Sequence, residues 1–316
     1  MVLRSDRARG TRVDVVGVSL SHPDRVLFPE ARFTKLDLAR YYESIGDWIV
    51  PQLIDRPLTL VRCPNGLGGG STNGPECFYM KHSKVWAPPA LRRVRIPELK
   101  KLGEYLIADS LSAVIGLVQM DVLEIHTWNA RFSRIEQPDR VVIDLDPGEQ
   151  VTWAATVAAA RTVRELFEAL DLASFVKTTG GRGLHIVVPL TPRADWAACL
   201  EFARECAFAL VRAHPHTFTE RFAKLGRERK ILVDYLRNNR TNTSVAAYSA
   251  RARPAAPVSV PVSWSELSPA RMPDRFTVKT LPSRLAKLRD DPWKEYGRTR
   301  QTIPRGALRA LAAVAS

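Results

Sequence analysis

One apolar segment constrains the fold more than any other part of the sequence, because it ends in two carboxylates. Residues 141–147 read Val-Val-Ile-Asp-Leu-Asp-Pro. Side chains of an extended strand alternate between its two faces, so Asp144 and Asp146 share one face while Leu145 points to the other. The segment therefore predicts a buried strand that presents a clamp for a divalent metal ion.

A second apolar segment, residues 231–236, also carries a single acid, Asp234. An unpaired charge inside a buried strand costs several kcal/mol of desolvation, which is unusual outside functional sites. We therefore expect the three acids to converge on one site that binds one or two hard cations and leaves coordination positions for water and phosphates. A plainer interpretation stays open, in which two acids are exposed at a strand end and the third is salt-bridged.

Between these two segments, residues 175–189 have the pattern of a strand, a glycine turn and a second strand. The turn suits an anion, because glycines let backbone amides approach a phosphate, Thr179 adds a hydroxyl and Arg182 offers a planar guanidinium. His185 follows just inside the second strand. The spacing matches neither a Walker loop nor a dinucleotide-binding fingerprint. An ordinary hairpin turn remains the alternative.

The chain is strongly basic. Its 47 Lys and Arg residues exceed its 33 Asp and Glu residues, which gives a formal charge of +14. This balance suits a polyanionic partner, although ribosomal and membrane-surface proteins share it. With 45% hydrophobic residues among 316, the chain can bury the core of one large domain or of two.

The four cysteines show no Cys-x-x-Cys pairing. We therefore expect free thiols in a reducing cytoplasm and no zinc ribbon, with a metal cluster of Cys63, Cys77 and His82 as the alternative. No apolar run approaches the ~20 residues needed to cross a bilayer, and the N-terminus has no hydrophobic signal core. The sequence predicts a soluble, cytoplasmic protein without a membrane partner.

The residues above carry a resemblance to a known family. The chain resembles the polymerase module of bacterial DNA ligase D, within the archaeo-eukaryotic primase superfamily. The resemblance runs through Ser-His-Pro-Asp-Arg-Val-Leu-Phe-Pro at 21–29, Arg-Pro-Leu at 56–58, Cys-Phe-Tyr-Met-Lys-His at 77–82, His-Thr-Trp at 126–128, the Asp-Leu-Asp-Pro strand, Tyr-Ser at 248–249 and Pro-Trp at 292–293.

The resemblance assigns roles to the active-site residues. In the family, the two acids of the Asp-Leu-Asp-Pro strand and a later strand Asp bind two metal ions, Mn²⁺ or Mg²⁺, which corresponds here to Asp144, Asp146 and Asp234. A Ser/Thr-Gly-x-Lys/Arg-Gly-x-His loop binds the incoming NTP or dNTP, as does a His that precedes a Trp and a downstream Arg. The matching residues are Thr179, Gly180, Arg182, Gly183, His185, His126 and Arg251, with Arg253 as the alternative to Arg251.

The resemblance also implies a DNA-end site. Two cations that recognise a recessed 5′ phosphate correspond to Arg25 and Lys35, and two rings that stack on template bases correspond to Phe78 and Tyr79. Stacking a base on an aromatic ring contributes about 1–3 kcal/mol. The neighbouring glycine-rich loop, residues 66–75, is expected to face DNA.

The predicted fold class is α/β (α+β). Helical patterns at 152–170 and 194–212 follow the acidic strand and the glycine hairpin, which gives the strand-helix-strand-strand-helix-strand order of an RRM-like sheet. The resemblance adds that this catalytic sheet packs against an N-terminal α/β lobe. We expect a basic arm at 1–19, one bilobal domain at 20–297 (N-terminal lobe 20–140, catalytic core 141–253, wrapping segment 254–297) and a basic, alanine-rich tail at 298–316.

The predicted function is metal-dependent nucleotidyl transfer to primer 3′ ends, with templated gap filling during non-homologous end joining. Similarity to the family implies several partners: double-strand-break ends with a 5′ phosphate, Ku, a ligase module and an end-bridging dimer on DNA. The chain has no Lys-x-Asp-Gly nucleophile motif of its own, since Lys-Leu-Asp-Leu at 35–38 is only a near match. A manganese-dependent Asp-x-Asp glycosyltransferase and a non-catalytic DNA-end-binding module are the alternatives.

Overall fold

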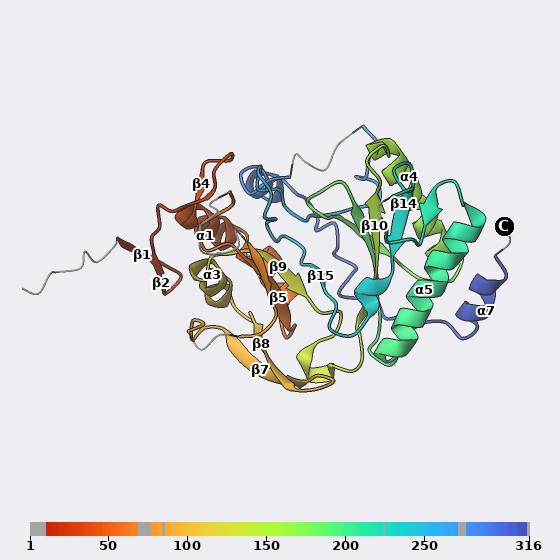
Figure 1. The fold of residues 1–316 in the computed structure, drawn as a ribbon, viewed down its shortest axis with the longest axis horizontal. Helices are drawn as coiled ribbons and strands as arrows, with labels where there is room; N and C mark the ends of the chain where they lie inside the picture. The colour runs from red at the N-terminus through yellow and green to blue at the C-terminus, as the bar shows by residue number, and fades with distance from the viewer. Residues whose placement is uncertain (1–10, 69–76, 84–85, 224, 271–275, 315–316) are drawn as a thin grey trace, which may run out of the picture.

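Two sheets organise the molecule, one of six strands and one of four. The computed structural model describes residues 11–68, 77–83, 86–223, 225–270 and 276–314. Figure 1 shows β5 and β9 of the four-stranded sheet on the side of the N-terminal elements, and β10 and β14 of the six-stranded sheet beside them. No helix within those ranges is long and apolar enough to cross a membrane.

The six-stranded sheet has the acidic strand near its centre. Its order is β13-β14-β10-β12-β11-β16, and every pair of neighbours is antiparallel except β13 and β14. The chain order β10, α4, β11, β12, α5, β14 is the split βαβ order predicted for an RRM-like sheet, so the predicted fold class is confirmed. The strands are β10 Arg140–Pro147, β11 Phe175–Thr178, β12 Leu184–Pro189, β13 Phe218–Thr219, β14 Ile231–Asp234 and β16 Pro261–Val262.

Two capped helices pack on this sheet. The Thr152 hydroxyl accepts a hydrogen bond from the Ala155 amide at 3.2 Å, and the Asp195 carboxylate accepts one from the Ala198 amide at 2.8 Å, so each helix begins at a side chain that satisfies a free amide. The helices are α4 Trp153–Glu168 and α5 Trp196–Ala213, close to the predicted 152–170 and 194–212.

The alternation of β10 separates core from site. Val141, Ile143 and Leu145 are buried in the main core together with the apolar residues of α4 and α5. Asp144 and Asp146 therefore point to the opposite face of the sheet, toward the N-terminal lobe.

The four-stranded sheet has the order β15-β9-β5-β6. Its strand β15 comes from the chain after β14 and pairs with β9 through Val245 and His126, so the catalytic part of the chain completes the sheet of the N-terminal lobe. Helix α3 is capped by Ser110. The elements are β5 Leu58–Arg62, β6 Phe78–Met80, β9 Val122–Thr127, β15 Ser244–Val245 and α3 Leu111–Gln119.

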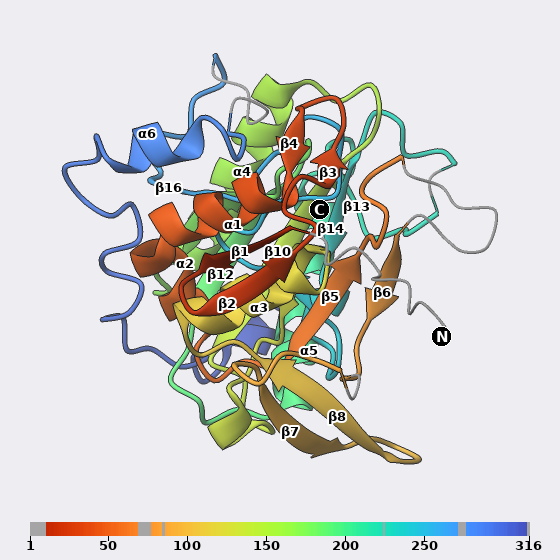
Figure 2. The ribbon, with the colours of Figure 1, turned by 90° about the vertical axis from the view of Figure 1, so that its left-hand side faces the viewer.

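The described part of the N-terminal segment is a hairpin in contact with α1 and α3 (Figure 2). Val15 and Leu20 are buried, and the boundary expected at residue 19 falls within β2. Thr34 and Asp37 form a capping box at the start of α1, and Ile45 separates α1 from α2. The elements are β1 Arg12–Val15, β2 Val18–Ser21, β3 Val26–Phe28, β4 Phe33–Thr34, α1 Lys35–Ser44 and α2 Gly46–Leu53.

The remaining elements lie around these two sheets. The indole of Trp293 donates to the Val176 carbonyl at 3.0 Å, which fixes the C-terminal segment to the six-stranded sheet. The remaining elements are the hairpin β7 Arg92–Pro97 and β8 Leu102–Ile107, the short helices η1 Phe132–Arg134, η2 Leu236–Asn238 and α6 Leu281–Leu285, and α7 Ala307–Ala312. Helix α7 contacts α5.

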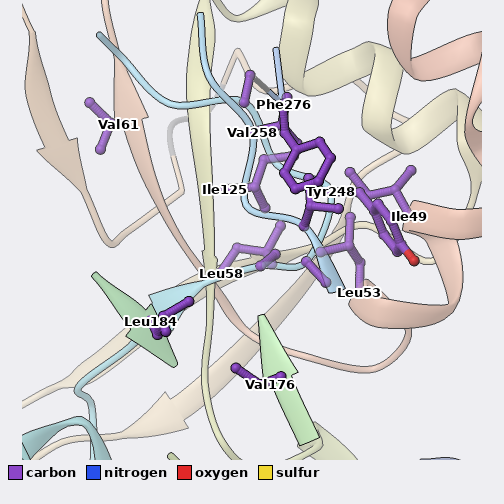
Figure 3. Close-up of a cluster of buried hydrophobic side chains, with 14 of the residues drawn as sticks. Ile49, Leu53, Leu58, Val61, Ile125, Val176, Leu184, Tyr248, Val258 and Phe276 are labelled. Atoms are coloured by element: carbon purple, nitrogen blue, oxygen red, sulfur yellow. The ribbon is translucent and has the colours of Figure 1, made fainter. Parts of the chain in front are cut away.

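One hydrophobic core runs through both lobes. Figure 3 shows Leu53 of α2 and Ile125 of β9 close to Tyr248 and Val258 of the later chain. The Tyr41 hydroxyl donates to the Tyr248 carbonyl at 2.8 Å and adds a polar tie at the same place. The two lobes are therefore packed as one body.

The cysteine prediction was wrong for one pair. Cys63 and Cys77 form a disulfide, so they are neither free thiols nor part of a metal cluster with His82, whose Nε2 lies 2.8 Å from Glu98. The antiparallel pairing of β5 with β6 places position 63 opposite position 77, a proximity that a sequence separation of 14 does not reveal. Most of the glycine-rich loop predicted at 66–75 lies outside the described residues.

Candidate functional site

The predicted metal-binding acids lie on one wall of a cavity of about 380 Å³. Asp144 of β10 is the direct cross-strand partner of Asp234 on β14 and of His185 on β12, so three site residues form a row across three strands. Asp146 follows two residues along β10 on the same face. The structure therefore brings together the acids from the two apolar segments.

The two paired acids have opposite pKa shifts. Burial raises the pKa of Asp144, but His185 at 3.4 Å and Arg237 at 3.2 Å outweigh it and hold the pKa well below the usual range. The pKa of Asp234 is raised, because its burial and the Asp144 charge outweigh Arg237 at 3.0 Å. A divalent cation placed between the two carboxylates would stabilise both in their charged form.

Two arginines hold the acidic oxygens in this structure. Arg237 bridges Asp144 and Asp234, while Arg227 Nη2 lies 2.9 Å from Asp146. Among the described residues, no three His, Cys, Asp or Glu side chains are arranged as a ready metal shell. The donor set nevertheless fits Mn²⁺ or Mg²⁺, since all three acids offer carboxylate oxygens to one cavity. A bound metal ion would compete with the two guanidinium groups for those oxygens.

The glycine turn is held close to the acidic strand. A Cβ on Gly183 would lie 2.4 Å from the Leu145 carbonyl, so only glycine permits this approach. The Thr179 hydroxyl donates to the Gly183 carbonyl at 3.1 Å, and Gly180 has a φ of +69°. Arg182 lines the cavity, but its Nη2 donates to three backbone carbonyls of the loop between β10 and α4, the shortest to Val151 at 2.7 Å.

His126 and Arg251 meet at a buried acid that the sequence analysis missed. Glu124 lies 2.8 Å from His126 Nε2 and 3.0 Å from Arg251 Nε, and Arg251 also donates to the Thr179 carbonyl. Burial opposes ionisation of Glu124, but His126 and Arg251 lower its pKa to about 2. Burial lowers the pKa of His126. Glu124 carries the same sequence signal as Asp234, a lone acid in an apolar strand.

Other residues of the site had weaker signals in the sequence. Arg227 and Arg237 lie in polar segments where a basic residue is unremarkable, and Arg253 also lines the cavity. Lys177 is buried, and its ammonium group donates to the Val245 carbonyl at 2.9 Å and to Ser259 at 2.7 Å. Its position inside an apolar strand was the available signal.

The predicted DNA-end residues form a second cluster around Asp121. Lys35 Nζ lies 2.8 Å from Asp121 Oδ1, and Arg25 Nη1 lies 3.2 Å from Oδ2. The Lys35 side chain is 1% exposed and that of Arg25 is 30% exposed, so Arg25 is the accessible cation of the two. Burial, opposed by Asp121, lowers the pKa of Lys35.

The two predicted stacking rings lie on opposite faces of β6. Tyr79 is 70% exposed, lines the cavity and meets the His126 ring edge-on at 6.0 Å. Phe78 packs against the core, with the Arg62 guanidinium 5.7 Å from its ring centre. Their alternation follows from strand geometry, so the two rings face different surroundings.

The RRM-like sheet carries its acids beside a glycine turn and faces a second sheet across the cavity. This arrangement is the one expected for a primase-polymerase fold. The family model described as "LigD, primase-polymerase domain" matches residues 34–293, so the chain belongs to this family and the predicted resemblance is confirmed.

Particular relatives are similar to this chain over most of its length. The multifunctional non-homologous end joining protein LigD of Pseudomonas aeruginosa is 38% identical over 98% of the chain, and the bifunctional LigD of Bacillus subtilis is 27% identical over 90%. The chain covers 36% and 45% of those two proteins. A solved structure of the polymerase domain of Mycobacterium tuberculosis Ligase D in complex with DNA has a TM-score of 0.79 and 31% identity, over 88% of this chain and 97% of that one.

Proposed function

We propose that this chain is a metal-dependent nucleotidyltransferase that extends primer 3′ ends and fills short templated gaps during non-homologous end joining. The observation that carries the proposal is the pairing of Asp144 with Asp234 on the wall of a cavity that also contains Thr179, His126 and Arg251, in a chain of the LigD primase-polymerase family. Opposed carboxylates beside cations and a glycine turn suit a nucleoside triphosphate bound through metal.

The proposed mechanism depends mainly on positioning. Two Mn²⁺ or Mg²⁺ ions held by Asp144, Asp146 and Asp234 would lower the pKa of the primer 3′ hydroxyl and stabilise charge on the departing pyrophosphate. Arg251 is fixed by Glu124 and the Thr179 carbonyl, so its charge is placed in advance beside the glycine turn. The turn amides and the Thr179 hydroxyl add donors for the triphosphate of an NTP or dNTP.

The basic N-terminal surface would hold the DNA. Arg25 is the accessible cation for a 5′ phosphate, and Asp121, which also binds the buried Lys35, holds its guanidinium. Tyr79 presents an exposed ring beside the cavity on which a template base can stack. Phe78 would stack on the template from the other face of β6. The formal charge of +14 favours a polyanionic partner of this kind.

We further propose that joining requires other modules. The chain spans about a third of the length of the multifunctional LigD proteins it matches. A ligase module, Ku and a second copy of this chain that bridges two ends are the partners expected for end joining in the cytoplasm.

The test is Mn²⁺-dependent extension of a gapped, 5′-phosphorylated duplex, with NTPs compared to dNTPs. Asp144→Ala and Asp234→Ala should abolish extension, whereas the control Asp290→Ala removes an exposed carboxylate of α6's C-terminal flank and should leave it unchanged. Salt-sensitive DNA binding without extension by the wild type would contradict the proposal and favour a non-catalytic DNA-end-binding module.

A further inference from the structure

A second cavity, of about 400 Å³, lies at the opposite end of β10 from the acids. Asp139, just before the start of β10, and Pro189, at the end of β12, both line it. Arg140 and Asp146 are six positions apart in an extended strand, which is about 20 Å. The cavity is therefore distinct from the proposed catalytic site.

The lining of this cavity is strongly basic. Arg56, Arg131, Arg134 and Arg300 line it against one acid, Asp139. Arg56 takes both carboxylate oxygens of Asp139, at 2.8 and 2.7 Å, and Arg131 Nε lies 3.3 Å from one of them. A single carboxylate is thus shared between two guanidinium groups and leaves an excess of positive charge.

The other two arginines of the cavity are Arg134 and Arg300. Within the described ranges, neither Arg134 nor Arg300 forms an ion pair. Arg300 Nη1 donates to the carbonyls of Gly297 at 2.9 Å and Thr299 at 3.1 Å, which orients its guanidinium at the cavity. Glu136, the acid nearest to Arg134 in sequence, forms an ion pair with Arg240 at 2.7 Å. These arginines are available to an anion.

A buried cation beneath the cavity adds to this field. Arg140 is 8% exposed and donates to Asn129 at 3.0 Å and to Thr127 at 2.6 Å, both neutral side chains. Burial and the neighbouring Arg56 lower the pKa of Arg140 to about 10. An anion in the cavity would offset the repulsion between these guanidinium groups.

Part of the remaining wall is apolar. Pro189, Leu190 and Pro192 lie there with Tyr296, whose ring is stacked on Trp293 at 4.8 Å and is thereby held in place. A cavity of this volume falls within the range of small-molecule sites. One cationic wall and one apolar wall match a ligand that has an anionic group at one end and a flat, weakly polar body at the other.

We propose that this cavity, the arginine pocket, binds a free nucleotide. Its phosphate would contact Arg131, Arg134 and Arg300, and its base would lie against Tyr296 and Leu190. Guanidinium groups match phosphate oxygens in a planar, bidentate geometry, and an aromatic face accepts any base by stacking. The inference does not rest on the proposed function, because no residue of the arginine pocket lines the acidic cavity.

Calorimetric titration of the full chain with AMP in EDTA tests the proposal, because chelation removes metal-assisted binding at the acids. The Arg134→Glu/Arg300→Glu variant should bind AMP at least tenfold more weakly. The control Arg298→Glu/Arg309→Glu makes the same change of charge at exposed positions outside the pocket and should stay within twofold of wild type. Arg251→Ala, in the acidic cavity, should also bind normally, and thermal melting would verify that each variant is folded.

Several results would overturn the proposal. These are no AMP binding by wild type at millimolar concentration, an equal loss in the charge-matched control, and a loss that follows Arg251→Ala instead. Inorganic phosphate that binds as tightly as AMP would show that the apolar wall contributes nothing and would reject a nucleotide. A 5′-phosphorylated hexanucleotide that binds much more tightly than AMP, through the same two arginines, would identify a strand end as the occupant and reject the free nucleotide.

Discussion

At the scale of single residues, two arginines in the acidic cavity compete with a metal ion for the carboxylates. Arg227 occupies an oxygen of Asp146, and Arg237 lies between Asp144 and Asp234. A guanidinium bound to a carboxylate offsets part of its negative charge and competes with a metal ion for its oxygens. Metal affinity in the absence of DNA therefore depends on how readily these arginines leave.

Arg227→Ala should strengthen Mn²⁺ binding several-fold, because it removes a competitor from Asp146. The measurement is free Mn²⁺ by electron paramagnetic resonance during titration of the chain without DNA. Arg229→Ala is the matched control, since that arginine contacts Gln150 rather than an acid. The Mn²⁺ affinity of this variant should equal that of wild type. Weaker Mn²⁺ binding by Arg227→Ala would contradict the competition.

Glu124 should make stability depend on pH in the acid range. Its pKa is lowered from 4.5 to about 2, so its ionic contribution is complete above pH 4.5 and is lost as pH falls toward 2. A shift of this size corresponds to a contribution on the order of 3 kcal/mol. Glu124→Gln should therefore be clearly less stable than wild type to urea at pH 7, and the difference should shrink between pH 4.5 and 3.5. A difference that stays constant over this range would rule out the charge as its source.

At the scale of elements, close contacts between neighbours fix the site. Gly183 should not tolerate a side chain, because a Cβ there meets the Leu145 carbonyl at 2.4 Å and would push the turn off β10. Gly183→Ala should cost about 1–3 kcal/mol of unfolding free energy. Gly297→Ala, where a Cβ meets nothing within 4 Å, is the control and should be nearly neutral in the same chemical denaturation. Equal stability of the two variants would show that the turn can move.

The disulfide between Cys63 and Cys77 should likewise stabilise the pairing of β5 with β6. It closes a loop with a sequence separation of 14, and cross-linking a loop of roughly 15 residues stabilises the folded state by about 3 kcal/mol. Dithiothreitol should lower the unfolding free energy of wild type by about this amount and should leave Cys77→Ser unchanged. Equal sensitivity of both proteins would place the effect elsewhere.

Local patterns predicted the elements well and predicted contacts between elements poorly. The period of apolar residues indicated α4 and α5, because that signal depends on near neighbours. The row from His185 through Asp144 to Asp234 depends on strand register, which the apolar alternation indicated only in part. Ion pairs such as Arg227 with Asp146 and the link from position 63 to 77 join distant segments, and no local pattern encodes them.

At the scale of the whole molecule, the later chain unites the two sheets. Strand β15 extends the N-terminal sheet, and Tyr248 and Val258 fill the core between the lobes. The acidic cavity has Asp144 on one sheet and His126 on the other. Its geometry therefore depends on how the lobes pack, and a disturbance of the shared core should reach both.

Leu53→Ala tests this coupling, because Leu53 is fully buried in the shared core and its truncation should cost about 2–5 kcal/mol. In a single cooperative body, amide hydrogen exchange should accelerate to a similar extent in β9 of one sheet and β12 of the other. Val94→Ala is the control, since Val94 belongs to a separate cluster under β7 and β8, and it should accelerate exchange chiefly there. Acceleration in β9 alone after Leu53→Ala would mean that the lobes unfold independently, and the cavity between them would then depend on bound DNA or nucleotide for its shape.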